Sequence, residues 1–294
     1  MSFSLRPLLL CMVGLLIVSC RPDFTVATIV EFPEGTDPAA EQFTLSQLLE
    51  RLEADFGPGV IHSVVDGNHR FLTTHGGDPL AAMGKLTPYF GSSRLEILPT
   101  VSADDPWVAA VLDSVDLARF GAERPAPGSG RATVATVSDD DASALLDALH
   151  RARRPDAEVR FAVLPSRDGQ TEVPAQIIGL DPSPNGLSNA DVASAVVQPD
   201  PQMGDLMVMI DMTDAGTRRW AQMTTAAFER GQQQVAILVD GEVWSAPAVN
   251  SPITGGQAAL TGNFKLPRAE ALALQVGWEP LKVPVRVVSR TLVE

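Results

Sequence analysis

The stretch Val235–Phe264 reads VAILVDGEVWSAPAVNSPITGGQAALTGNF. Its first five residues are all apolar, and three of them are β-branched, which predicts a buried strand. Asp240-Gly241 has the composition of a two-residue hairpin turn, so residues 242–249 should return as the partner strand. The glycines and prolines of residues 252–262 predict an irregular arm after the hairpin.

The segments on either side complete one α+β unit around this hairpin. Strands are predicted over 206–212 and 283–289 from their apolar or alternating residues. Asp214 is expected to cap a helix that ends at Gly231. Pro267 suits the first turn of a second helix. The resulting order is βαββαβ, in which helices cover one face of an antiparallel sheet.

The N-terminal part of the chain shows the same order of elements. Asp66-Gly67-Asn68 predicts the turn of a hairpin, while Thr44 and Asp78 are expected to cap two helices. We therefore expect an α+β fold with two ferredoxin-like βαββαβ subdomains and a mixed α/β bridging segment between them. The predicted strands cover residues 24–32, 60–65, 70–74 and 94–101, and the predicted helices cover 44–56 and 79–89.

The bridging segment, residues 102–186, has a less regular pattern. A helix is predicted over 139–152, where Asp139, Asp140 and Asp141 suit the positive end of the helix dipole. Strands are predicted over 158–164 and 173–180, and a short helix over 188–195 follows the segment.

The first twenty residues, MSFSLRPLLLCMVGLLIVSC, are expected to lie outside the fold. Arg6 precedes an apolar run that has the length of a signal-peptide core and is too short to span a bilayer. The end of the run resembles a bacterial lipoprotein signal, which implies cleavage of residues 1–19 and lipid attachment to Cys20. An uncleaved anchor is the alternative. The lipoprotein interpretation predicts a soluble body that is tethered only through acyl chains.

Composition excludes several classes of function. There are 36 acidic residues against 22 basic ones, and the net charge is -14. Nucleic acid is therefore not expected as a partner, because phosphate binding needs a basic surface. Cys11 and Cys20 are the two cysteines of the chain, so the folded part has no thiol for a disulfide, a zinc knuckle or a nucleophile.

Candidate catalytic residues are few. His69 and His75 could hold a metal only with further ligands, and Asp139–Asp141 lacks the pattern of a calcium loop. Ser245 lies outside a G-x-S-x-G elbow, and Gly255-Gly256 matches no nucleotide-binding fingerprint. We therefore expect no enzymatic activity, no metal and no cofactor, and a hydrolase with an unrecognised site is the weakest alternative.

The order of motifs in residues 235–264 resembles the first extracytoplasmic domain of the SecD family. The shared motifs are the Asp-Gly turn, Ser245-Ala246-Pro247, Ile253-Thr254-Gly255-Gly256 and Thr261-Gly262-Asn263-Phe264. The resemblance extends over about 187–290 and is weak over 24–101. It implies a base-like subdomain (20–101), a bridging segment (102–186) and a SecD-like head subdomain (187–294).

The SecD resemblance implies binding rather than catalysis. SecD uses a membrane bundle for proton coupling, and this sequence has no later apolar run of membrane-spanning length. We expect an envelope protein on the periplasmic side that binds a translocating polypeptide, the Sec translocase or other envelope proteins. A scaffold without a translocation role is the alternative, and the glycines and prolines would then only fix the fold. The candidate binding residues are Ser245, Pro247, Asn250, Ile253, Thr254, Gly255, Gly256 and Asn263.

Overall fold

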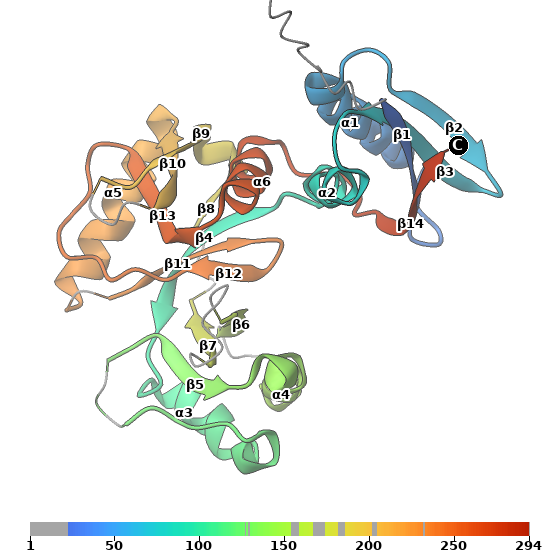
Figure 1. Ribbon diagram of the computed structural model, residues 1–294. Helices are drawn as coiled ribbons and strands as arrows, with labels where there is room; N and C mark the ends of the chain where they lie inside the picture. Colours follow the sequence, from blue (N-terminus) through green and yellow to red (C-terminus); the bar gives the residue numbers. More distant parts are fainter. Residues whose placement is uncertain are drawn as a thin grey trace, which may run out of the picture.

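The chain folds into three connected parts, which Figure 1 shows for the computed structural model. The structure describes residues 23–293 except 127, 129, 154–158, 167–173, 182–185, 202–204 and 232; of Gly262 and Asn263 it describes only the backbone. The fold is α+β with several antiparallel sheets. We call the three parts the base (residues 23–90 and 286–293), the bridging part (102–181) and the head (187–277).

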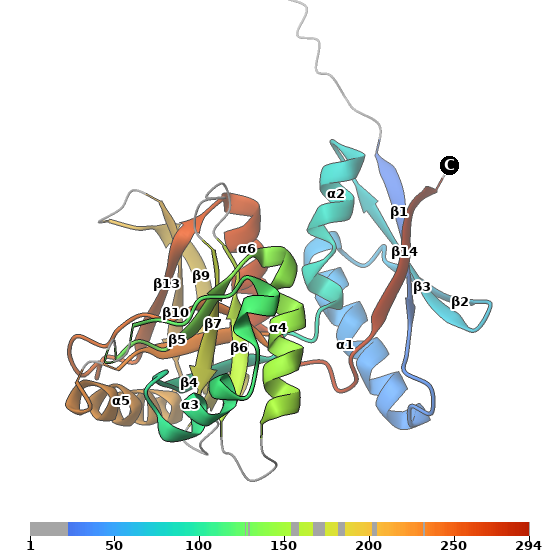
Figure 2. The ribbon, with the colours of Figure 1, turned by 90° about the horizontal axis from the view of Figure 1, so that it is seen from below.

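The base is a four-stranded antiparallel sheet in the order β14-β1-β3-β2. Both of its α-helices cover the sheet face that is turned toward the rest of the molecule (Figure 2). Alternation along β1 sends Val26 and Val30 into the core beneath these helices, where Phe71 is also fully buried. Asp66 and Gly67, at φ 51° and 80°, form the predicted turn between β2 and β3. The elements are β1 (Phe24–Glu31), α1 (Pro38–Phe56), β2 (Ile61–Val65), β3 (Asn68–His75), α2 (Pro79–Lys85), the 3₁₀ helix η1 (Pro88–Phe90) and β14 (Arg286–Val293).

The two halves of the chain exchange their closing strands. β14 lies beside β1, in a register that runs from Thr25 opposite Val293 to Glu31 opposite Arg286. The strand β4 (Leu95–Val101) instead leaves the base and pairs with β11 (Val235–Val239). The prediction that residues 94–101 close the first sheet and residues 283–289 the second is therefore wrong, although both strands exist.

Burial gives the physical reason for the exchange. Leu95, Ile97 and Leu98 are all buried, so β4 needs cover on both of its faces and suits the interior of a larger sheet. β14 leaves Leu292 and Val293 almost half exposed, which suits the edge of a smaller sheet. The residue pattern predicts a strand in both places, but it does not show which strand each of them pairs with.

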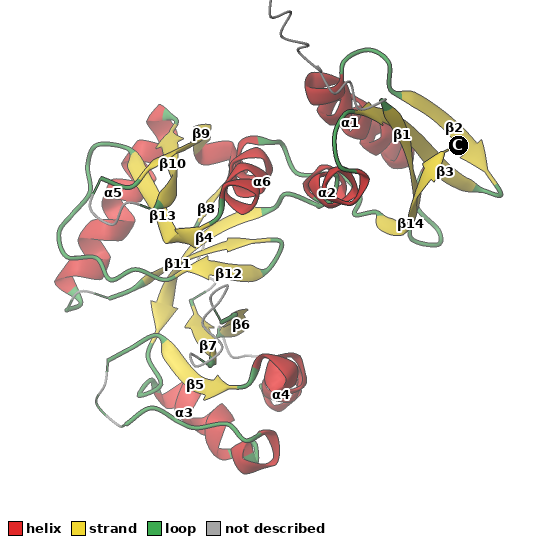
Figure 3. Ribbon diagram, in the orientation of Figure 1, coloured by secondary structure: helices red, strands yellow, loops and turns green. Residues whose placement is uncertain are grey.

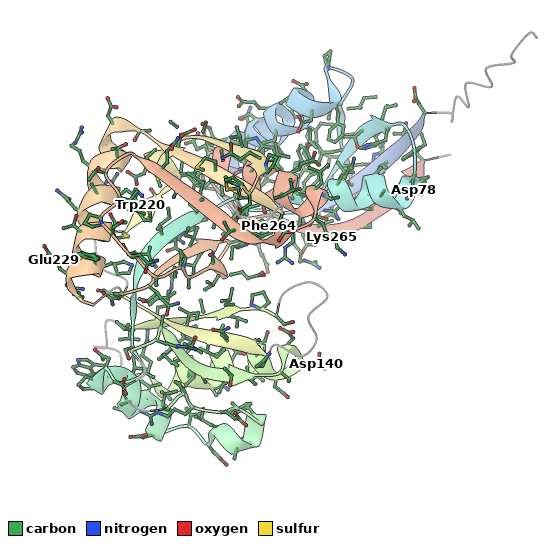
Figure 4. The ribbon with its side chains drawn as sticks, turned by 60° about the vertical axis from the view of Figure 1, so that its left-hand side comes forward. Asp78, Asp140, Trp220, Glu229, Phe264 and Lys265 are labelled. Atoms are coloured by element: carbon green, nitrogen blue, oxygen red, sulfur yellow. The ribbon has the colours of Figure 1, made fainter. Side chains whose placement is uncertain are left out.

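The head surrounds the largest core of the described chain. Its three-stranded sheet has the order β13-β10-β9, and β11, β12 and β4 lie in a second sheet. Trp220 of α5 and Phe264 of β13 are buried in this core together with Leu95 and Ile97 of β4, and Figure 4 labels the first two. The elements are β8 (Leu187–Ser188), the 3₁₀ helix η3 (Asn189–Asp191), β9 (Val192–Pro199), β10 (Leu206–Met212), α5 (Asp214–Glu229), β11, β12 (Glu242–Ser245), β13 (Gln257–Phe264) and α6 (Leu266–Gly277).

The bridging part continues the second sheet, whose strands run β12-β11-β4-β7-β5 with β6 beside β7 and β8 beside β4. Its helices lie at one end of the molecule, and Figure 3 separates them by colour from the strands. Ser138 caps α4 through its hydroxyl, so Asp139–Asp141 form the first turn rather than the cap itself. The elements are α3 (Pro106–Asp113), the 3₁₀ helix η2 (Leu117–Phe120), β5 (Thr133–Val137), α4 (Asp139–Ala152), β6 (Arg160–Leu164) and β7 (Ala175–Leu180).

Several predicted boundaries differ from the structure. Asp37, not Thr44, caps α1, so that helix begins six residues earlier than predicted. Thr213 rather than Asp214 caps α5, whereas Asp78 caps α2 as predicted. The helix predicted over 79–89 ends at Lys85, three residues before Pro88, which has no N–H to donate.

Two predicted irregular or helical segments are strands. The helix predicted over 188–195 is a single 3₁₀ turn followed by β9, in which Val192, Val196 and Val197 favour extended backbone. The arm predicted over 252–262 is shorter, because its second half is the strand β13 paired with β10.

The strand exchange predicts which pairs of introduced cysteines can form a disulfide. Ala27 lies directly opposite Thr291, so Ala27→Cys with Thr291→Cys in a Cys11→Ser, Cys20→Ser background should form an intrachain disulfide, detected by non-reducing electrophoresis and mass spectrometry. The control pair Ala27→Cys with Thr100→Cys joins β1 to β4 and should remain reduced. Oxidation of the control pair but not the first would contradict the observed sheet order.

Candidate functional site

The predicted arm connects β12 to β13 along the surface of the head. Ser245 ends β12 opposite Ile237, and the carbonyl of Pro247 accepts a hydrogen bond from the Val235 N–H at 3.0 Å. These two residues therefore continue the hairpin. Pro247, Asn250, Thr254 and Gly255 are the members of the predicted set that are exposed, so a partner could reach them.

The middle of the arm is fastened to α5. The Ile253 N–H donates to the Thr224 hydroxyl at 3.0 Å, and Thr224 is fully buried. Gly256 has φ +70°, and a Cβ at this position would lie 2.2 Å from Oγ1 of Thr217. Ile253 and Gly256 thus fix the fold of the arm. For these two members of the predicted set, the structure supports a packing role.

The sheet edge beside the arm is partly occupied. Met212 donates its N–H to the Gly256 carbonyl at 2.8 Å, which places the Gly256 backbone toward β10. The Gln257 carbonyl accepts from the Trp220 indole at 3.1 Å, and the Trp244 and Phe264 rings meet 6.0 Å apart at the other end of β13. An added strand would have to compete with the Trp220 hydrogen bond and the contact between Trp244 and Phe264 along β13.

The structure does not describe the side chains of two predicted site residues. Cys20 lies outside the described residues, and Asn263 belongs to β13 but its side chain is not described.

The histidines considered as metal ligands contact other side chains. Nδ1 of His69 lies 3.0 Å from Nε2 of His62, and Nε2 of His69 lies 3.0 Å from Oε1 of Glu41. Nε2 of His75 lies 2.7 Å from the Thr73 hydroxyl. Burial, and secondarily the neighbouring His69, lowers the pKa of His62. Among the described residues, no cluster of three or more His, Cys, Asp or Glu side chains has a metal-binding arrangement.

A groove of about 570 Å³ runs between the base and the head. Three aromatic side chains form one continuous wall, with Phe56 and Tyr89 5.2 Å apart and Tyr89 and Trp278 5.1 Å apart between ring centroids. Leu274 of α6 adds an aliphatic surface. Burial and the hydrogen bond to Asp55 raise the pKa of Tyr89, so its hydroxyl stays protonated at neutral pH.

The opposite wall of the groove is the strand β9, represented by Ala195, Val196 and Val197. β9 is an edge strand, since in the described chain it pairs with β10 alone. The Val196 side chain is 48% exposed, although apolar side chains of this size are usually covered.

Register shows which main-chain groups of β9 face the groove. Asp200 donates its N–H to the Asp205 carbonyl at 2.7 Å, which makes that pair a hydrogen-bonded pair of the β9–β10 ladder. Hydrogen-bonded pairs alternate along antiparallel strands, so Val196 bonds to β10 while Ala195 and Val197 direct their N–H and C=O groups to the free edge. The groove therefore presents two donors and two acceptors in a row, as an incoming strand requires.

The charges at the groove favour a neutral or basic ligand. Asp55 and Glu270 line it together with a single cation, Lys85, and the whole chain is strongly acidic. A larger cavity of about 720 Å³ is lined by residues of β4 and β8, but its Arg160 already bonds both carboxylate oxygens of Glu96 at 3.0 Å. The groove along β9 is thus the better candidate site.

Comparison with known proteins confirms the SecD-like character of the C-terminal part. Residues 164–283 match the family model of the SecDF P1 head subdomain. The SecD translocase subunit of Dictyoglomus turgidum is 32% identical over 108 residues, which are 37% of this chain and 26% of that protein. The Acidaminococcus fermentans SecD subunit is 35% identical over 107 residues, or 36% of this chain and 25% of that protein. The chain spans about a quarter of the curated relatives it matches.

Solved SecDF structures share the fold over most of the chain. A crystal structure of SecDF in a super-membrane-facing form aligns with a TM-score of 0.55 at 18% identity, over 93% of this chain and 31% of that one. A structure of SecDF described as a membrane component that enhances protein export aligns with a TM-score of 0.52 at 19% identity, over 90% of this chain and 98% of that one. In the described residues, no helix combines the length and apolarity needed to cross a bilayer.

The packing of the arm predicts how much stability is lost when a methyl group is added at Gly256. Gly256→Ala should destabilise the protein by about 1–3 kcal/mol, because the new Cβ meets Thr217 and the backbone is left-handed. Chemical denaturation measures this change. Gly255→Ala is the matched control, since no atom lies within 4 Å of its Cβ position. Equal stability of the two variants would show that Gly256 is not constrained.

Proposed function

We propose that this chain is a non-enzymatic, lipid-anchored protein of the bacterial envelope that binds extended polypeptide segments in connection with Sec-dependent export. The observation that carries the proposal is the open edge of β9 facing an apolar groove. The similarity of residues 164–283 to the SecDF P1 head subdomain supports the link to export. The sheet order β14-β1-β3-β2 also supports a ferredoxin-like base whose last strand comes from the C-terminal part.

The ligand is an extended segment with apolar side chains at alternate positions. Its main chain pairs with Ala195 and Val197, and every second side chain packs against Phe56, Tyr89 or Trp278. Main-chain pairing does not depend on the sequence of the ligand, so the site accepts many polypeptides that share this pattern. Asp55 and Glu270 add a preference for basic over acidic segments.

The exposed arm residues Asn250, Thr254 and Gly255 are a second candidate contact surface. They lead into β13, the edge opposite β9 in the same three-stranded sheet. We assign them to a partner protein of the envelope rather than to the extended polypeptide, because Trp220 already occupies a main-chain acceptor of β13.

Main-chain N–H groups of β9 point alternately to β10 and to the free edge, so a proline substitution can remove one of the edge groups alone. Ala195→Pro removes an N–H that faces the groove and leaves the ladder to β10 intact, so the protein should fold but bind peptide at least tenfold more weakly. The measurement is fluorescence anisotropy with a labelled twelve-residue peptide of alternating valine and lysine, against the same peptide with proline at alternate positions. Ala193→Pro is the matched control, because it lies on β9 outside the groove.

Crosslinking distinguishes the two surfaces and the scaffold alternative. A photoreactive residue at Val196 should capture exported polypeptides in cells, and one at Thr254 should capture Sec or other envelope proteins. The control position is Trp107 of α3, which is also 48% exposed. Capture at Val196 no greater than at Trp107 would contradict polypeptide binding. Normal secretion in a deletion strain with a changed envelope would favour the scaffold role.

Lipid anchoring is tested separately. Cys20→Ser should abolish incorporation of labelled palmitate and release the protein from the membrane fraction, because multiple acyl chains are needed for stable attachment. Labelling that persists in Cys20→Ser would contradict the lipoprotein assignment.

A further inference from the structure

Three of the four histidines of the chain belong to the base, and two of them connect its outer strand to its first helix. Nε2 of His69 on β3 lies 3.0 Å from Oε1 of Glu41 on α1. Nδ1 of His69 lies 3.0 Å from Nε2 of His62 on β2. Two hydrogen bonds therefore run from α1 through β3 to β2, and we call Glu41, His69 and His62 the histidine link.

Strand register brings the two rings together. Phe71 lies opposite His62 and Val64 lies opposite His69 in the β2–β3 pairing, so the two imidazoles are diagonal neighbours on the inner face of the sheet. Their ring centroids are 5.2 Å apart. The His62 ring also lies against Phe71, at 5.0 Å between centroids, and Phe71 is fully buried. The histidine link thus closes the core of the base at the edge that β2 forms.

The number of protons on the two rings decides whether the histidine link stays whole. An ionised carboxylate such as that of Glu41 only accepts hydrogen bonds, so Nε2 of His69 carries a proton. The contact between His69 and His62 holds one N–H, and a first extra proton on the pair leaves both hydrogen bonds in place. A second extra proton puts an N–H on both facing nitrogens, so the bond between the rings is lost and two cations lie side by side.

The surrounding charges do not remove this obstacle. They are contributed by every neighbouring element of the base, namely Glu31 on β1, Glu34 in the loop before α1, Glu41 on α1, Arg70 on β3 and Arg286 on β14. Glu31 is already paired with Arg286, and Glu34 is exposed. Arg70 lies on the outer face of the sheet, where it donates to the Ser63 hydroxyl at 3.1 Å. The carboxylates favour a first positive charge on the pair, but the contact between the two nitrogens still opposes a second.

Acid therefore lowers the stability of the base. Burial, and secondarily the neighbouring His69, lowers the pKa of His62 from its ordinary value of 6.5. The unfolded chain binds this proton more readily than the folded one does. The stability that the neutral ring contributes is thus present above about pH 6.5 and is lost as the pH falls below it.

The third histidine of the base acts in the same direction but lies outside the link. Burial, and secondarily Lys85, lowers the pKa of His75. Its Nε2 lies 2.7 Å from the Thr73 hydroxyl on the same strand, so His75 does not connect β3 to α1 or β2 through a hydrogen bond of this kind. It is therefore the natural comparison for the link.

We propose that Glu41, His69 and His62 form an acid-sensitive latch, which holds the β2–β3 hairpin against α1 at neutral pH and releases it on acidification. Release moves the His62 ring away from Phe71. Val64, on the same face of β2, is already 61% exposed, so the base then presents an enlarged apolar surface at this edge. The latch lies wholly within the base and depends neither on lipid anchoring nor on the groove.

Hydrogen exchange of the full chain, read by mass spectrometry and corrected for the pH dependence of intrinsic exchange, tests the latch. The protection of residues 61–75 should fall about tenfold between pH 7.5 and pH 5.0, while that of β10 and β11 should change less than about twofold. His62→Gln keeps an N–H for Nδ1 of His69 but takes up no proton. In this variant, residues 61–75 should stay protected at pH 5.0.

The matched control is His75→Gln. It removes the other buried histidine of β3 and leaves the histidine link in place, so acid should still release the hairpin. Nitrogen NMR of the unsubstituted protein gives a second readout, because scalar coupling across the bond between His69 and His62 should be present at pH 7.5 and absent at pH 5.0. Coupling or protection that persists at pH 5.0 would overturn the latch. Acid release that persists in His62→Gln, or that disappears in His75→Gln, would overturn it too.

Discussion

The fold depends on one constraint, which is that each half of the chain supplies a strand to the other. β4 completes the core of the head with Leu95 and Ile97, and β14 closes the base against β1. The two parts are therefore joined by two crossings instead of one linker. Arg51 of α1 contacts both crossings, because its guanidinium donates to the carbonyl of Gly91 in the first and to that of Glu279 in the second.

Local chemistry explains which features could be predicted from the sequence. The Asp-Gly turns at residues 66–67 and 240–241 form as expected, because left-handed backbone at both positions is a property of the turn residues themselves. Strand pairing depends on residues that are far apart in the sequence, so the sheet positions predicted for β4 and β14 are wrong. The SecD-like motifs pointed to the C-terminal part of the chain, where residues 164–283 match the SecDF P1 head subdomain. They did not reveal the groove, because Phe56, Tyr89, Val196 and Trp278 come from four distant segments with no common motif.

The arm and the groove lie at opposite edges of one small sheet. They differ in how many of their main-chain groups are already hydrogen-bonded. At the arm, Thr224 and Trp220 already bond to main-chain groups, and Gly256 packs too closely for any side chain. At β9, the outward groups of Ala195 and Val197 have no strand partner in the described chain. The glycines and prolines of the sequence therefore suggest the arm as the binding site. The more accessible edge, β9, carries no such distinctive residues.

The strand exchange also governs the order in which this protein can fold. Residue 25 lies opposite residue 293, so almost the whole chain separates the partners of the base sheet. Contacts of such long sequence separation form slowly, and during synthesis β1 has no partner on that side until Arg286–Val293 has emerged. The head can form earlier, because β9 to α6 is contiguous and needs only β4 from upstream. The base sheet is thus completed after the head, and until then the unpaired edge of β1 is open to pairing with other chains.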